Sequence, residues 1–142
     1  MADLTANYDR PYKEPAKERT YAAGAVHIYK GDGLMILRGT GYAVKMANTA
    51  LGQFIGVATE EVDNSGGSAG DLNVKVRTGV QLFTKGTAAI TDIGTMAGAV
   101  DSDTVTAGEG TEVVNVGRVV ALKSTTHVWV DTDDHSLKSH DS

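Results

Sequence analysis

The chain has 142 residues, of which 41% are apolar and 22% are charged, so its length and composition are those of one globular domain with a buried core. The formal net charge is -5, and no predicted element gathers the Lys and Arg residues that would bind a nucleic-acid backbone. Cysteine is absent, which excludes disulfides, thiolate metal sites and thiol catalysis.

Residues 1–24 differ from the rest of the chain because they carry both of its prolines, Pro11 and Pro15, which interrupt any helix. We expect a flexible N-terminal arm, either a frayed terminus or a segment that becomes ordered on a partner. Three of the five tyrosines lie in it, and aromatic residues are enriched in protein interfaces. The candidate partner-binding residues are Tyr8, Arg10, Pro11, Tyr12, Pro15 and Tyr21.

From residue 25 the pattern changes to short strands separated by glycine turns. We expect a β domain over residues 25–131 and a polar C-terminal tail over 132–142. Seventeen glycines against two prolines, with abundant Val and Thr, favour strands and turns over long helices. Outside the central stretch, strands are predicted at 25–29, 34–37, 42–45, 88–90, 95–100, 118–122 and 127–130. A single helical turn is predicted at 46–50 and a polar loop at 101–110.

The centre of the domain is predicted between residues 54 and 83, where two strands flank a polar, glycine-rich loop. In 72–76 apolar residues alternate with polar ones, which is typical of a strand with one exposed face. The same apolar face continues at 80–82, so one strand bent at Gly79 is favoured over a hairpin. The whole pattern predicts an all-β fold of eight to ten short strands, either a small barrel or a compact sandwich.

One segment matches a catalytic motif. Residues 66–70, Gly-Gly-Ser-Ala-Gly, fit the G-x-S-x-G pattern of a hydrolase nucleophile elbow. That motif needs a strand-to-helix turn, whereas a predicted strand follows Ser68, so we interpret the segment as a loop. A hydrolase acting through Ser68 is therefore only the third choice of function.

The C-terminal region contains a group of possible metal ligands: Asp131, Asp133, Asp134, His135 and His140. Hard cations need several oxygens around one point, and this tail has Ser136 where a calcium-binding loop needs Gly, so we interpret it as a solvated acidic tail. His27 is expected to be a packed or edge residue. Glycine pairs at 31–33, 39–41 and 108–110 lack the further Gly or Lys of nucleotide-binding loops and are interpreted as turns. The sequence predicts no catalytic residue, no metal site and no cofactor.

The first residues lack the apolar core of a signal peptide. No apolar run in the sequence approaches the roughly 18 residues of a membrane span. We therefore expect an intracellular origin and no membrane partner. From the residues alone, one function that fits is a small intracellular β-barrel adaptor, which binds protein or peptide through an exposed strand edge.

Three segments occur in a characteristic order: FIGVA (54–58), AGDLNVKVRTGV (69–80) and VGRVVALKSTTHVWV (116–130), with the glycine-rich loop after the first. This order resembles that of the capsid cement, or decoration, proteins of tailed bacteriophages. The resemblance covers approximately residues 24–131 and rests on glycines and alternating valines at matching spacing.

The resemblance implies a small β-tulip-like barrel with bends at Gly56, Gly70, Gly79 and Gly117. It also implies a structural protein, not an enzyme, that binds the outer surface of an assembled phage head and stabilises it against internal DNA pressure. Its partners would be the major capsid protein, gripped by the arm 1–24, and further copies of the chain, as trimers at local three-fold positions. The protein would be made in the host cytoplasm and would reside on the virion.

Overall fold

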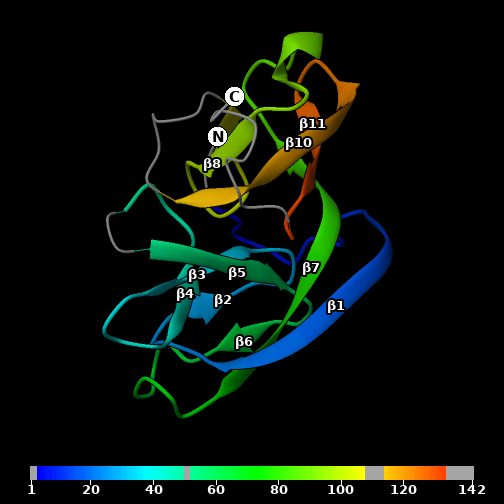
Figure 1. Cartoon of the computed structure of the whole chain (residues 1–142). Helices are drawn as coiled ribbons and strands as arrows, with labels where there is room; N and C mark the ends of the chain where they lie inside the picture. Colours follow the sequence, from blue (N-terminus) through cyan, green and yellow to red (C-terminus); the bar gives the residue numbers. More distant parts are fainter. Residues whose placement is uncertain (1–2, 50–51, 108–113, 134–142) are drawn as a thin grey trace.

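The structure, a computed structural model, describes residues 3–49, 52–107 and 114–133 and is built from antiparallel strands (Figure 1). The strands are β1 (Tyr12–Ala22), β2 (His27–Ile28), β3 (Gly33–Leu37), β4 (Ala43–Lys45), β5 (Gly52–Ala58), β6 (Val62–Asp63), β7 (Asn73–Thr84), β8 (Met96–Ala99), β9 (Val105–Ala107), β10 (Asn115–Ser124) and β11 (His127–Asp131). The prediction of an all-β, barrel-like fold is confirmed. In the described ranges the helical content is one 3-10 turn, Ile90–Asp92, and no helix is long and apolar enough to cross a membrane.

Strand β7 connects two halves of the molecule. The main sheet has the order β4-β3-β5-β7-β11-β10-β8-β9, and β1 also pairs with β7, while β2 and β6 form a separate pair. In Figure 1 β7 runs from the lower half, which contains β1 to β6, into the upper half, which contains β8 to β11. A twelve-residue strand can serve both halves because it is long enough to pair with β5 at one end and β11 at the other.

The apolar residues form two buried clusters, which lie on opposite faces of β3 and β5. Neighbouring residues of a strand point to opposite faces, so Leu34 packs in the lower cluster and Met35 in the upper one. Val57 and Ala58 divide in the same way. The upper cluster includes Phe54, Phe83, Val116, Val119, Val128 and Val130, and the lower one includes Ile28, Ala43, Val62, Val74 and Val76. The β3–β5 layer is therefore covered on both faces.

The structure has the predicted bend at Gly79, and residues 73–84 form one continuous strand, β7, rather than a hairpin. Gly79 has a φ of 135°, in the region that favours glycine. Thr132 holds this position from the side: its Oγ1 accepts from the Gly79 N–H at 2.9 Å and donates to the Gly79 carbonyl at 2.8 Å. Before the bend β7 pairs with β5 at Arg77, and after it with β11 at Val80.

The other three glycines expected at bends also lie at irregular backbone. Gly56 and Gly70 have φ values of 142° and 90°. Gly56 lies beside the register shift between β3 and β5. Gly117 lies at the register shift between β10 and β8, where a Cβ atom would collide with the carbonyl oxygen of Asp131.

Residues 12–22 differ from the expectation of a flexible arm, because they form β1 and pair with β7 through the whole length of the strand. Two residues, Glu14 and Pro15, are inserted where the register shifts between Lys13 and Ala16. Proline has no N–H to donate, so a strand tolerates it at such an irregularity. The folded domain therefore begins well before residue 25.

Shorter elements also differ from the expectation. Residues 46–49 form no helical turn, and 88–90 lead into the 3-10 turn instead of forming a strand. Part of the expected loop 101–110 is strand β9. These segments are too short for their apolar residues to show a helical or strand period, so the sequence pattern could not assign them. In the tail, Thr132 is fully buried, and residues 134–142 lie outside the described part of the chain.

We predict that Gly79→Val lowers the free energy of unfolding by about 1–3 kcal/mol, because a β-branched residue strains the positive φ that the bend requires. Gly66→Val is the matched control, since a Cβ atom at Gly66 meets nothing within 4 Å. Urea denaturation of both variants measures the difference. Equal midpoints for the two would show that β7 does not need the bend.

Candidate partner-binding site at the N-terminal segment

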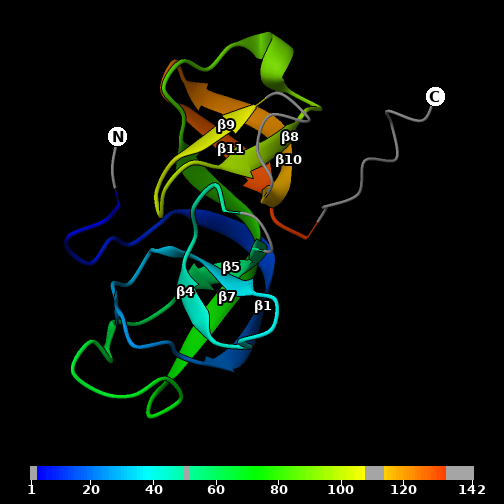
Figure 2. The ribbon, with the colours of Figure 1, turned by 90° about the vertical axis from the view of Figure 1, so that its left-hand side faces the viewer.

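Residues 3–9, which we call the strap, cross the junction between the two halves before the chain enters β1. In Figure 2 their dark blue trace lies between the upper and the lower half. The Leu4 N–H donates to Ser102 Oγ at 2.9 Å, and the Tyr8 N–H donates to the Lys30 carbonyl at 2.7 Å. The strap is therefore attached to both halves through backbone hydrogen bonds.

Arg10 anchors the end of the strap inside the protein. Only 4% of the residue is exposed. Its guanidinium donates to the Gly31 carbonyl at 2.9 Å, to the Leu82 carbonyl at 2.7 Å and to Asp103 Oδ1 at 2.8 Å. It also lies over the Phe83 ring, 4.6 Å from the centroid. The expectation that Arg10 binds a partner does not hold in this structure, because its donors are used within the fold.

The other predicted partner-binding residues are spread over the molecule. Tyr12 is 38% exposed and stacks on Arg77, whose Cζ lies 3.8 Å from the ring centroid. Tyr21 is half-buried against the lower cluster. Pro11 is exposed, and its carbonyl accepts from the Leu82 N–H. Pro15 lies at the register shift of β1. Pro11 and Tyr12 thus keep exposed surface, while Tyr21 contributes to the fold.

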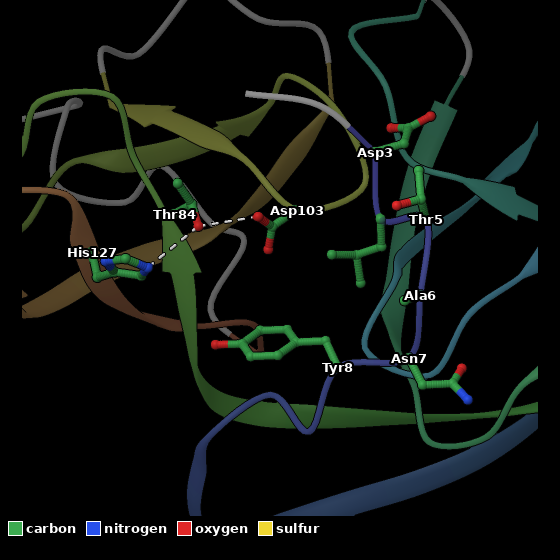
Figure 3. A pocket seen from close by; sticks show the side chains of 9 residues that line it. Asp3, Thr5, Ala6, Asn7, Tyr8, Thr84, Asp103 and His127 are labelled. Carbon is green, nitrogen blue, oxygen red and sulfur yellow. Dashed lines mark hydrogen bonds between the residues drawn. The ribbon is translucent and has the colours of Figure 1, made fainter.

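A pocket of about 450 Å³ lies beside the strap (Figure 3). It is lined by Asp3, Leu4, Thr5, Ala6, Asn7, Tyr8, Thr84, Asp103 and His127. In it, Thr84 Oγ1 lies 3.1 Å from Asp103 Oδ2 and 3.5 Å from His127 Nε2. The Thr84 hydroxyl therefore lies between the Asp103 carboxylate and the His127 imidazole. In a catalytic triad the imidazole lies between the other two groups, so this order differs from that of a triad. The other oxygen of Asp103 holds Arg10, so this arrangement fixes the pocket wall.

The outer edge of β1 is paired with another described strand only at its C-terminal end, where Ala23 and Ala43 of β4 form a parallel bridge and the Gly24 N–H donates to the Ala43 carbonyl. Backbone groups of a strand point alternately to its two edges. The Ala23 N–H donates to Leu72, on the β7 side, whereas Gly79, the partner of Ala16, donates away from β1 to Thr132. The alternation therefore directs the N–H and C=O groups of Ala16, Glu18 and Thr20 outward, whereas the outward side of Ala22 faces the bridge to β4.

Asp32 is a buried carboxylate that the sequence did not single out, because its Gly-Asp-Gly setting was interpreted as a turn. It is 0% exposed, its Oδ2 accepts from the Tyr29 N–H at 2.8 Å, and its Oδ1 has no hydrogen-bond partner. Burial raises the pKa of this carboxyl, while the Tyr29 N–H, Ser102 and Lys45 act in the opposite direction. Among the described residues Asp32 is the one acid that is buried, and it lies beside Ser102, which the strap contacts.

His27 lies on β2, stacked on the Tyr29 ring at 4.1 Å, with Nε2 2.7 Å from Glu61 Oε2. This hydrogen bond, and a second one from Asn7, lower the pKa of the Glu61 carboxyl. Ser68 lies in an exposed loop, where its N–H donates to Asp71. These contacts give His27 and Ser68 structural partners.

The possible metal ligands of the tail are only partly within the described residues. Asp131 and Asp133 belong to the structure, whereas Asp134, His135 and His140 lie outside the described ranges. Within those ranges, no group of three or more His, Asp or Glu side chains is placed to hold a metal ion.

We predict that Arg10→Met lowers the free energy of unfolding by about 2–4 kcal/mol, because it leaves two buried carbonyls and the Asp103 carboxylate without their donor. Arg38→Met is the control, since Arg38 is exposed on the turn after β3. Chemical denaturation compares the two. If Arg10→Met is as mild as the control, Arg10 is not an anchor and its assignment to a partner surface returns.

Comparison with protein-family models, with curated proteins and with solved structures finds no match for this chain.

Proposed function

We propose that this chain is a structural protein that binds the outer surface of an assembled phage head and stabilises it without catalysing a reaction. The proposal takes up the resemblance of residues 24–131 to capsid cement proteins. The observation that supports a binding role is the outer edge of β1 over residues 16–20, where outward backbone groups are available to another chain before β4 meets the edge at Ala23. The proposed grip differs from the sequence-based expectation, because it comes from a folded strand edge and not from a loose arm.

The mode of binding is strand addition. An extended segment of the major capsid protein pairs with β1, so that the backbone of both partners satisfies its hydrogen bonds. The register of β1 on β7 is unbroken from Ala16 to Ala22, and residues 16–20 of this part are the template for a further strand, since β4 bridges the edge at Ala23. Before Ala16 the inserted residues interrupt the edge. Exposed charges of both signs, on Lys17 and Glu18, set the register, since like charges opposite each other are unfavourable.

Many copies acting together supply the stabilisation. A protein that binds only the assembled shell stabilises it by mass action, and each interface can be smaller than the ~1,600 Å² of a typical stable complex. Copies that touch around a symmetry axis add avidity, so we propose trimers at the local three-fold positions of the virion.

The alternative is an intracellular adaptor that binds a peptide through the same edge of β1. Both functions use the backbone of residues 16–20, so the two are distinguished by the partner that binds and not by the edge itself. An adaptor binds isolated extended peptides and has no effect on the heat resistance of a particle.

We predict that Thr20→Pro abolishes binding while the domain stays folded, because Thr20 is exposed and its N–H points to the outer edge. Thr20→Ala is the matched control, since it changes the side chain and keeps the N–H. Co-sedimentation with stripped particles measures binding, and thermal unfolding verifies the fold. Equal binding by the two variants would exclude this edge as the site.

A second prediction addresses the particle itself. Removing the protein from phage heads should lower the temperature at which they release DNA, and adding it back should restore the resistance. The recovery should saturate at a fixed ratio to capsid subunits. If stripped and decorated particles release DNA at the same temperature, the cement function is wrong and the adaptor function takes its place.

A further inference from the structure

Asp32 is the least satisfied buried charge of the described chain. It lies in the turn before β3, fully buried, with one carboxylate oxygen on the Tyr29 N–H and the other without a hydrogen-bond partner. Lys45 Nζ is 3.8 Å from Oδ2, beyond hydrogen-bond distance, and the Ser102 side chain is the other neighbour that favours the carboxylate. Burial of a carboxylate that keeps one unpartnered oxygen is costly, because its hydration is only partly replaced.

The strap is seated on the two groups that stand next to this carboxylate. Lys45 Nζ donates to the Leu4 carbonyl at 3.3 Å. Ser102 accepts from the Leu4 N–H through Oγ, and its own N–H donates to Asp3 Oδ1 at 2.7 Å. The strap also brings a second carboxylate, Asp3, toward Asp32. When the strap closes, Leu4 binds the two groups beside Asp32, and the negatively charged Asp3 comes near the Asp32 carboxylate, one of whose oxygens has no hydrogen-bond partner.

We propose that the strap opens and closes as a latch, and that closing is coupled to the uptake of one proton by Asp32. The two states differ in the surroundings of this group. In the closed state Asp32 is buried next to Asp3, whereas opening removes Asp3 and gives water access past Lys45 and Ser102, the two groups that Leu4 covers.

The direction of the pH dependence follows from this difference. The charged groups that face Asp32 are Lys45 on β4, which favours the carboxylate, and Asp3 on the strap, which disfavours it. Burial is the largest influence and raises the pKa in the closed state. The closed state therefore holds the proton more tightly than the open one. Closure is most favourable at acid pH and weakens as the pH rises from the ordinary Asp value through the raised one.

The C-terminal end of the strap is fixed at Arg10 when the strap opens. Arg10 is buried and bonded to Gly31, Leu82 and Asp103, so it stays in place while the strap moves. The other strap contacts include those of Asn7 with Glu61 and Lys30, the Tyr8 N–H with the Lys30 carbonyl, and the ion pair between Asp9 and Lys30. Opening removes one wall of the pocket beside Thr84 and frees a segment that carries Leu4 and Tyr8. This inference does not depend on the function proposed above.

The test is amide exchange measured by NMR on the full chain, with each rate divided by its intrinsic rate at that pH. The reporters are the amides of Leu4 and Tyr8, whose N–H groups the closed strap bonds, and Val74 in the lower cluster is the reference. As the pH falls from 7.5 to below the ordinary pKa of an aspartate, about 4, protection of Leu4 should rise through the raised pKa of Asp32, by at most about tenfold per pH unit for one proton. Protection of Val74 should not follow it.

The variants separate charge from structure. Asp32→Asn keeps the oxygen that accepts from Tyr29, so Leu4 should be more protected than in the wild type at pH 7.5 and independent of pH. Asp133→Asn, an exposed carboxylate at the other end of the chain, should behave as the wild type. Leu4 protection that is flat with pH in the wild type, or that changes in parallel with Val74, overturns the latch. The wild-type titration decides the question even if Asp32→Asn does not fold.

Discussion

The bend of β7 at Gly79, held by the hydroxyl of Thr132, sets how the two halves of the molecule are joined. Because β7 turns there, it leaves β5 and joins β11, and one strand serves both halves of the molecule. The two apolar clusters then lie on opposite faces of the β3–β5 layer. β1 follows β7 across the bend by inserting two residues opposite it. A fold of short strands thus gains its continuity from one long, bent strand.

The N-terminal segment completes this arrangement. β1 covers one edge of β7, and Arg10 joins the turn before β3, the strand β7 and the loop before β9 through one buried guanidinium. Placing a charge there is tolerable because its donors reach two carbonyls and a carboxylate. Two features remain available for interaction: the outer edge of β1 and the strap. The first supports the proposed binding of a capsid, and the second supports a device that responds to pH.

The sequence predicted the parts whose pattern is local. The alternation in 72–76 and 80–82 predicted β7, and Gly79 predicted its bend, because period and turn chemistry act over a few residues. β1 was missed because it is an edge strand with mixed charges and a proline, which resembles an arm. Arg10 was misassigned because its acceptors lie 21, 72 and 93 residues away. The burial of Asp32 was likewise invisible, since a Gly-Asp-Gly turn carries no sign of what covers it.

Residues 12–22 belong to the folded domain before any partner binds, and amide exchange of the isolated protein, measured residue by residue along β1, distinguishes this from a flexible arm. Lys17, Arg19 and Tyr21, whose N–H groups face β7, should exchange as slowly as strand amides of β7, while Glu18 and Thr20 exchange faster. Fast exchange at all five positions would show that this segment is a flexible arm.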